Sequence, residues 1–249
     1  MSNTIKKEDV SSSFEIGVSG PIALFCNPMF KTGGEKFSYP VPTYGALKGL
    51  VESIYWKPTF IVVIDSVRIM NEIKYTHKTL TISKFHEAFN KTRGTLNKEL
   101  FTYTYLSDVH YQIRFHMKWN NYQSELVEDR NWGKHNAIMN RQINRGGKCN
   151  PFLGASECYA DIFKEEFESR KGYYDESGKV NFGIMFHSYL WGTEYDENDV
   201  NRRKLRKAFW TAEMINGVIT FPQAEDCIVE DVRTLESHEQ TVYPNSKVS

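Results

Sequence analysis

The chain has 249 residues, of which 40% are hydrophobic and 25% are charged, as in ordinary soluble globular proteins. This length corresponds to one large domain or two small ones, and it is sufficient to bury an apolar core without disulfides. The formal net charge is zero, which excludes a polycation that binds nucleic acid by bulk attraction.

The first third of the sequence predicts a strand, a helix and a second strand, in that order. Apolar residues alternate with others over Phe14–Val18, which is the pattern of a strand, whereas the polar residues 1–12 predict a disordered lead-in. After a loop at residues 27–38, an amphipathic helix is expected between Pro42 and Pro58, with Tyr55 in its last turn. The unbroken apolar run Phe60–Ile64 then predicts a buried central strand.

The middle third contains the clearest strand of the sequence. Residues 71–105 show weak periodicity and are interpreted as an irregular insertion. From His110 to Trp119, apolar and polar residues alternate strictly, and the polar face includes no acid. A second helix is expected from about Lys134 to Arg145, because Gly146-Gly147 would end it. A strand is expected near residues 152–162.

The last third is predicted to be β-rich. Apolar runs at residues 182–191 and 209–221 predict strands, and Asn216-Gly217 divides the second run with the signal of a hairpin turn. Over the first two thirds, the order strand, helix, strand, strand, helix, strand is that of a ferredoxin-like domain. We therefore predict an α+β protein, with a ferredoxin-like domain at residues 1–165 and a C-terminal β-rich domain, a small antiparallel sheet, at residues 166–249.

The cysteines and the apolar segments indicate neither a disulfide framework nor a membrane protein. The four cysteines include no CxxC pair and no zinc-finger spacing with histidine, so we expect reduced thiols. The N-terminus is polar, and no apolar run approaches the ~20 residues that span a bilayer. The expectation is a soluble cytoplasmic protein.

Histidine, lysine and tyrosine are the residues left to carry chemistry. The sequence lacks Walker, HExxH, GxSxG and GxGxxG motifs, and it shows no evident metal site and no cofactor motif. RNA contains its own nucleophile, the 2′-hydroxyl, so a base, an acid and a cation can cut it without a metal. Lys134-His135 is the best candidate pair, because residues 131–156 include four basic residues and no Asp or Glu. A lysine–histidine dipeptide alone is a weak signal, since most such pairs are surface residues.

Several short motifs follow one another over roughly residues 14–230. They are Gly33-Gly34-Glu35-Lys36, Ser38-Tyr39, Val41-Pro42-Thr43-Tyr44, Ala46-Leu47-Lys48-Gly49, Glu52-Ser53-Ile54-Tyr55-Trp56-Lys57-Pro58, Tyr103-Thr104-Tyr105-Leu106, Asp108-Val109-His110-Tyr111, Asp129-Arg130-Asn131, Gly133-Lys134-His135, Phe152-Leu153-Gly154-Ala155, Glu157-Cys158, Phe221-Pro222 and Glu225-Asp226-Cys227. Any one of them is weak, but in this order and spacing they resemble the subtype I-C members of the Cas-five family of CRISPR-associated proteins.

This resemblance implies an endoribonuclease that cuts CRISPR precursor RNA at the 3′ base of the repeat hairpin, without a metal. The family's catalytic tyrosine, lysine and histidine fall on Tyr55, Lys134 and His135, and a further helix lysine falls on Lys48. Without the resemblance, Tyr55 would be interpreted as a core aromatic. The products would be a 2′,3′-cyclic phosphate and a 5′-hydroxyl. The protein would then remain with backbone and large subunits in a type I-C surveillance complex.

The residues expected to contact RNA lie in four regions. They are Lys31, Gly33, Gly34 and Lys36 in the first loop, Tyr44 and Lys48 on the first helix, Arg114, His116 and Lys118 on the polar strand face, and Arg141, Arg145 and Lys148 on or after the second helix. Two alternatives stay open. The chain could be a non-catalytic subunit that binds the 5′ handle of the guide RNA, or, with less support, a metal-dependent DNA nuclease.

Overall fold

The computed structural model describes residues 9–26, 35–83, 98–121, 124–191 and 204–234. In chain order, the elements are β1 (Phe14–Ala23), β2 (Lys36–Phe37), α1 (Tyr44–Ile54), β3 (Phe60–Ile69), β4 (Lys74–Ser83), β5 (Lys98–Trp119), the 3-10 helix η2 (Ser124–Asp129), α2 (Trp132–Ile143), β6 (Asp161–Lys164), β7 (Lys179–Trp191), β8 (Lys204–Ile215), β9 (Val218–Thr220), the 3-10 helix η3 (Ala224–Asp226) and β10 (Ile228–Thr234).

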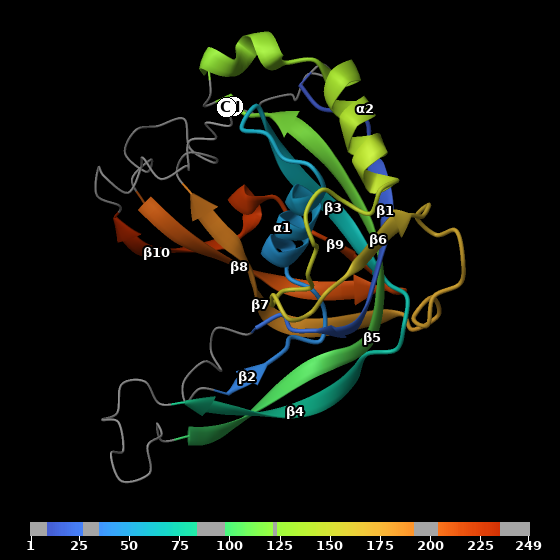
Figure 1. The fold of residues 1–249 in the computed structure, drawn as a ribbon, viewed down its shortest axis with the longest axis vertical. Coiled ribbons are helices and arrows are strands. Elements are labelled where there is room, and N and C mark those ends of the chain that lie inside the picture. Colours follow the sequence, from blue (N-terminus) through green and yellow to red (C-terminus); the bar gives the residue numbers. More distant parts are fainter. Residues whose placement is uncertain (1–8, 27–34, 84–97, 122–123, 192–203, 235–249) are drawn as a thin grey trace.

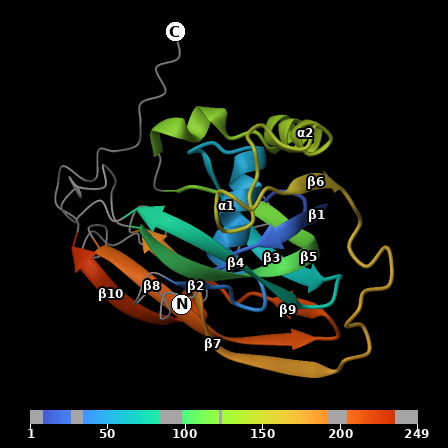
Figure 2. The ribbon, with the colours of Figure 1, turned by 60° about the horizontal axis from the view of Figure 1, so that its bottom comes forward.

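The described strands form one hydrogen-bonded sheet, so the chain is an α+β protein. Along the sheet the order is β10-β8-β9-β3-β5-β1-β6, while β2 and β4 pair with β5 and β7 pairs with β8. All of these pairs are antiparallel except β2 with β5. Because β9 pairs with both β3 and β8, the C-terminal strands continue the sheet of the first two thirds. Figure 2 shows α1 and α2 on the same side of this sheet.

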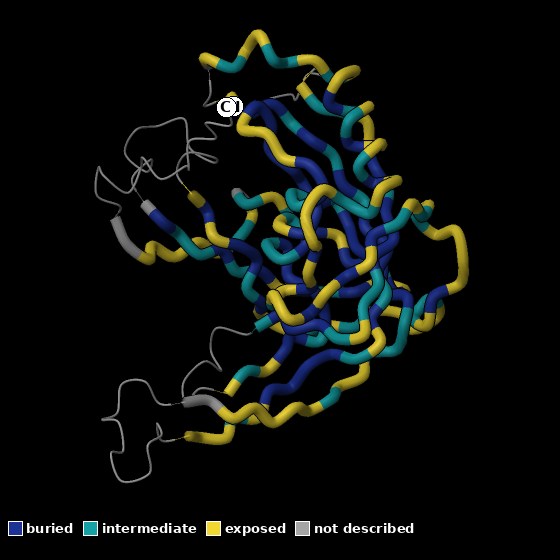
Figure 3. The backbone as a smooth tube through the Cα atoms, viewed as in Figure 1, coloured by how far each residue is buried: buried dark blue, intermediate teal, exposed yellow. Residues whose placement is uncertain are grey.

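The core lies between the helices and the inner face of the sheet. Ile16, Ile113 and Val67 stand side by side across β1, β5 and β3, and each is fully buried. Leu47 and Val51, one turn apart on α1, cover this layer and are also fully buried. Burial of each side chain of this kind stabilises the fold by about 1.5–3 kcal/mol. Figure 3 shows the buried backbone gathered in the middle of the molecule.

The prediction of an irregular insertion at residues 71–105 is wrong. β4 and the first half of β5 pair without interruption from Lys74 opposite Ser107 to Ser83 opposite Lys98. They form the long two-stranded arm at the bottom of Figure 1. Residues 77–81 of this arm are all exposed, and on the paired part of β5 only residues 103–106 are buried. The apolar residues of β4 therefore had no buried face to occupy, and the usual alternation is weak.

Three further predictions concern a turn, the N-terminal lead-in and the strand near residues 152–162. The Asn216-Gly217 turn is confirmed, since both residues have the positive φ (48° and 80°) of a two-residue hairpin turn between β8 and β9. The lead-in is ordered at Ser11, whose N–H donates to the Met117 carbonyl at 2.8 Å; residues 1–8 lie outside the described part. Only the end of the strand predicted near residues 152–162 is found, because β6 begins at Asp161 and residues 151–160 form a loop that precedes it.

A glycine explains why that loop packs so closely on β1. Gly154 has φ +84°, and a Cβ at this position would lie 2.2 Å from the Leu24 carbonyl oxygen. The adjacent Leu153 carbonyl accepts the Leu24 N–H at 3.0 Å, so the loop is attached beside the end of β1. Only glycine fits this approach.

Candidate active site

Tyr55 is placed by the end of α1. Thr43 caps the start of this helix, its hydroxyl accepting the Ala46 N–H at 3.3 Å. The helix ends at Ile54, and Tyr55 is extended (φ −160°, ψ 125°), so it does not continue the helical turn that the sequence predicted for it. The Tyr55 ring instead packs against Phe60, with centroids 5.5 Å apart, and only 7% of the residue is exposed.

His135 is placed by the start of α2. The helix begins two residues before its predicted start, at Trp132, because the Asn131 side chain caps it by accepting the Lys134 N–H at 3.0 Å. His135, Met139 and Ile143 follow at intervals of four and form the buried face of α2. His135 is completely buried, with the rings of Phe60 and Trp119 at 5.3 and 5.9 Å.

The structure brings Tyr55 and His135 into direct contact across 80 residues of sequence, with the Tyr55 hydroxyl 2.9 Å from His135 Nδ1. The other ring nitrogen, Nε2, lies 2.9 Å from the Asp129 carbonyl oxygen. A carbonyl only accepts hydrogen bonds, so Nε2 must be protonated. In neutral His135, Nδ1 is therefore an acceptor, and the Tyr55 hydroxyl donates to it.

Lys134 precedes His135 on α2, and its side chain faces outward. Its side chain is 52% exposed, and its ammonium is hydrogen-bonded to Asp129 Oδ1. The second carboxylate oxygen, Oδ2, accepts the Thr59 hydroxyl at 2.9 Å and lies 3.6 Å from His135 Nε2. Asp129 thus lies between the lysine and the histidine.

The charges of this site act on two pKa values. The hydrogen bond from Lys134, helped by that from Thr59, holds the pKa of the Asp129 carboxyl below its usual range. Burial, followed by the negative charge of Asp129, raises the pKa of Tyr55 above 10. At neutral pH, Asp129 is therefore a carboxylate and Tyr55 a protonated phenol.

The two RNA-contact candidates on α1 lie outside the Tyr55–His135 contact. Lys48 is seven residues before Tyr55, about 10 Å along the helix axis, and forms an ion pair with Glu52 at 3.7 Å. The Tyr44 ring is stacked on His187 with centroids 4.1 Å apart, and the residue is only 6% exposed. In this arrangement the Tyr44 ring fastens α1 to β7.

The polar face of β5 meets carboxylates from its neighbours. Arg114 donates to Glu15 of β1 at 3.0 Å and lies over the Phe167 ring, and His116 Nδ1 is 2.8 Å from Asp65 of β3. Lys118 is on the same face. This face lacks acids only along its own strand, because adjacent strands supply them. Its predicted contact with RNA stays a prediction.

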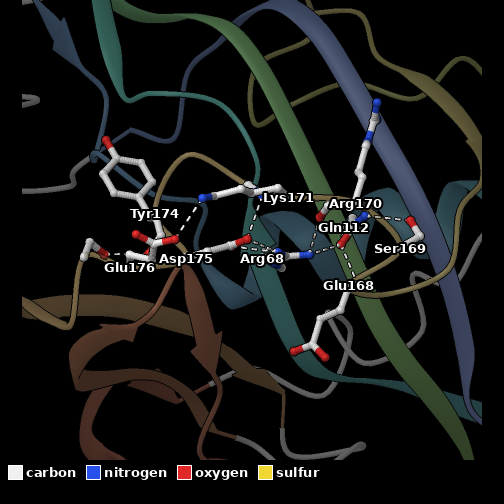
Figure 4. Close-up of polar contacts among 11 residues, drawn as sticks. Arg68, Gln112, Glu168, Ser169, Arg170, Lys171, Tyr174, Asp175 and Glu176 are labelled. Atoms are coloured by element: carbon white, nitrogen blue, oxygen red, sulfur yellow. Dashed lines mark hydrogen bonds and ion pairs between the residues drawn. The ribbon is translucent and has the colours of Figure 1, made fainter.

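Residues 165–178, between β6 and β7, cross this face of the sheet, as Figure 4 shows. We call this segment the strap. Arg68 of β3 donates to both carboxylate oxygens of Asp175 in the strap, at 2.6 and 2.7 Å, and to the Arg170 carbonyl at 3.0 Å. Gln112 of β5 accepts the Glu168 N–H at 2.9 Å. The strap therefore covers the sheet near Gln112, on the side opposite α1 and α2.

The remaining predicted RNA contacts are spread over the surface. Arg141, Arg145 and Lys148 are exposed on or just after α2, the helix that holds Lys134. Lys36 lies 4.9 Å from the centre of the Tyr103 ring, on the arm side of the molecule. The candidates Lys31, Gly33 and Gly34 lie outside the described residues.

Sequence reasoning missed Thr59 and Asp129 as members of the site. Asp129 belongs to one of the motifs noted above, but nothing local indicates that its carboxylate meets the side chain of Lys134 across the start of a helix. In the parts of the chain that the structure describes, His, Cys, Asp and Glu side chains form no group of three that could hold a metal ion. None of the described helices is long and apolar enough to cross a membrane.

The chain is similar to known proteins over most of its length. The family model described as CRISPR-associated protein (Cas5) matches residues 14–222. A curated protein of Mannheimia succiniciproducens, named CRISPR pre-crRNA endoribonuclease Cas5d, is 26% identical over 234 residues, which cover 86% of this chain and 96% of that protein. A protein of the same name from Thermus thermophilus is 50% identical over 56 residues, 22% of this chain and 24% of its own length.

Two solved structures share the fold. A crystal structure of a CRISPR-associated protein has a TM-score of 0.71 and 35% identity, over 89% of this chain and 97% of that one. A functionally uncharacterized protein from Streptococcus mutans has a TM-score of 0.68 and 33% identity, over 89% of this chain and 98% of its own.

Proposed function

The chain belongs to the CRISPR-associated Cas5 family, and we propose that it is an endoribonuclease that cuts CRISPR precursor RNA within the repeat. The observation that carries this proposal is the 2.9 Å contact between the Tyr55 hydroxyl and His135 Nδ1. The exposed ammonium of Lys134 is linked to the other side of the His135 ring through Asp129. The relatives whose names state this activity supply the substrate class.

In the proposed mechanism, protons pass between RNA and His135 through Tyr55. His135 is fully buried, whereas Tyr55 keeps 7% of its surface exposed, so in this proposal RNA reaches the pair through Tyr55. The Tyr55 hydroxyl takes the proton of the attacking 2′-hydroxyl and passes its own proton to His135 Nδ1. Because its pKa is raised, Tyr55 does not ionise in advance, and the two transfers are coupled. The imidazolium that forms keeps the hydrogen bond from Nε2 to the Asp129 carbonyl.

Lys134 supplies the positive charge that this reaction needs. Its ammonium has three N–H donors, and the bond to Asp129 occupies one of them. The others can bind the phosphate oxygens on which negative charge builds as the 2′-oxygen attacks. The leaving 5′-oxygen takes a proton from a water molecule, and His135 afterwards returns its extra proton to solvent through Tyr55. The products are a 2′,3′-cyclic phosphate and a 5′-hydroxyl, and no step requires a metal.

The fold supports RNA binding around this site. We propose that β1-α1-β3-β5-α2-β6 is a ferredoxin-like domain, because these elements follow in the expected order and their strands pair as β3-β5-β1-β6. The exposed cations of α2 would bind the backbone of the repeat hairpin, since the major groove of A-form RNA is too narrow for side chains to read. After cleavage the protein would stay in a type I-C surveillance complex with its backbone and large subunits.

Incubation of the purified protein with repeat RNA in EDTA tests the proposal. We expect cleavage at the 3′ base of the hairpin, and we expect a 2′-deoxy substitution at the cut site to abolish it. Cutting of the deoxy substrate would refute the mechanism. RNA that is bound but left intact would identify the chain as a subunit that holds the 5′ handle. DNA cleavage only with added Mg²⁺ would favour the third alternative.

Two histidine variants separate catalysis from folding. His135→Ala should slow cleavage by roughly 10²–10⁴-fold and leave RNA affinity nearly intact, because phosphate contacts elsewhere supply most of the binding. His187→Ala is the matched control. It removes another buried histidine, which lies at the contact of α1 with β7. Burial lowers the pKa of His187 to about 4. The substitution should lower stability and retain cleavage.

A further inference from the structure

Asp129 contacts two of the three catalytic candidates, Lys134 and His135. Its carboxylate binds the Lys134 ammonium through Oδ1, and its Oδ2 accepts the Thr59 hydroxyl and lies 3.6 Å from His135 Nε2. Its backbone carbonyl accepts the hydrogen bond from the same nitrogen. One residue therefore connects the cation of the site with its proton acceptor.

Stability alone does not account for this arrangement. Lys134 and Asp129 have side chains that are 52% and 30% exposed, and an exposed pair of this kind contributes only about 0–1 kcal/mol to folding. Thr59, by contrast, is almost completely buried and directs its hydroxyl at Asp129 from the start of β3. The fold thus fixes the carboxylate from its buried side and leaves its other side to the lysine.

We propose that Asp129 is a positioning residue for RNA cleavage, an inference that rests on the proposed function. Its carboxylate holds the Lys134 ammonium on the Nε2 side of His135, with donors left for the scissile phosphate. The same negative charge lies next to His135 and stabilises the imidazolium that forms when Tyr55 passes its proton inward. The second effect resembles the part that a carboxylate plays behind the histidine of a serine protease.

Asp129→Asn tests the carboxylate without removing the other contacts. The amide keeps the size of the side chain and an oxygen that accepts the Thr59 hydroxyl. The backbone carbonyl of residue 129 still accepts the hydrogen bond from His135 Nε2. We expect the single-turnover rate at saturating RNA to fall about 10- to 100-fold, less than for His135→Ala, because the reacting groups remain. RNA affinity should stay the same or rise, since a negative charge near the phosphate is lost.

The pH dependence gives a readout that a merely structural role would not move. Loss of the neighbouring charge makes His135 a weaker proton acceptor, so the acidic limb of the rate–pH profile should shift to lower pH. The matched control is Glu176→Gln, which removes the carboxylate from another exposed ion pair with a lysine five residues away, Lys171, at 2.8 Å. This control should leave both the rate and the pH profile unchanged.

The outcomes are distinguishable. If the wild-type protein does not cut repeat RNA, the proposed function fails and this inference falls with it. If the wild type cuts and His135→Ala is slow, but Asp129→Asn cuts at the wild-type rate with the same acidic limb, only the role of Asp129 is overturned. Should Asp129→Asn fail to fold, Thr59→Val releases the carboxylate instead. It should then slow cleavage about 2- to 10-fold, and an unchanged rate would refute the inference.

Discussion

Tyr55→Phe removes a single oxygen atom from the centre of the proposed site. In the wild type the Tyr55 hydroxyl donates to His135 Nδ1 at 2.9 Å in a buried position. The variant leaves that nitrogen without its donor, which costs about 1–3 kcal/mol of stability. Native domains are stable by about 5–15 kcal/mol, so the variant should remain folded.

The expected effect on cleavage is larger than this structural cost can explain. Without the hydroxyl, the proton path from the 2′-hydroxyl to His135 is interrupted, and we expect a loss of roughly 10²–10⁴ in rate. That loss corresponds to about 3–5 kcal/mol of transition-state stabilisation. If the variant is fully folded, a cleavage rate this low therefore cannot be attributed to a fraction of unfolded molecules.

Single-turnover cleavage of repeat RNA, together with urea unfolding of the same preparation, measures both quantities. Tyr174→Phe is the control. Tyr174 belongs to the strap, on the other side of the sheet from Tyr55, and its hydroxyl accepts the Ile73 N–H at 3.0 Å. The control variant should lose stability and keep the wild-type rate. Cleavage by Tyr55→Phe at close to the wild-type rate would refute the proton path through Tyr55.

Three further predictions concern the strap and the RNA surface. Arg68→Met leaves the Asp175 carboxylate without its guanidinium partner and should cost about 2–3 kcal/mol in urea unfolding. This is less than for a fully buried pair because the Asp175 side chain is 23% exposed, and a loss below about 0.5 kcal/mol would contradict this assignment. Burial alone would raise the pKa of Asp175, but the hydrogen bonds from Arg68 and the Gly172 N–H together lower it. The ion pair therefore stabilises the fold at pH values above the unfolded pKa of about 3.9, and this stability is lost as the pH falls through the lower pKa of the folded state. The stability difference between wild type and Arg68→Met should therefore narrow below about pH 4, and a constant difference would argue against the linkage. Arg141→Ala should weaken RNA binding and reduce the slope of log affinity against log salt by about 0.7–0.9, whereas an unchanged slope would remove this residue from the RNA surface.

Local patterns predicted the elements that have one buried face. The alternation from His110 to Trp119 is part of β5, and the helix that follows Pro42 is α1, capped by Thr43. These predictions succeeded because burial of one face of a strand or helix places apolar residues at a regular spacing along the sequence. The arm formed by β4 and β5 was missed for the same reason, since the exposed residues 77–81 of β4 and 98–100 of β5 have no buried face to impose a period.

Contacts between distant residues could not be predicted in this way. The acid-free face of β5 is neutralised by Glu15 and Asp65, which stand on β1 and β3 and are adjacent only after the strands pair. The fastening of the strap by Arg68 joins residues more than 100 positions apart. A one-dimensional charge pattern does not contain these distances.

The sequence by itself determined which residue types are available and, through its family resemblance, which tyrosine, lysine and histidine to examine. Only the tertiary structure decided that Tyr55 leaves its helix, that His135 is wholly buried with an orientation set by the Asp129 carbonyl, and that Asp129 reaches both Lys134 and Thr59. The physical reason is that the direction of a hydrogen bond and the exclusion of water depend on packing between α1, α2 and β3. No single segment of the chain specifies that packing.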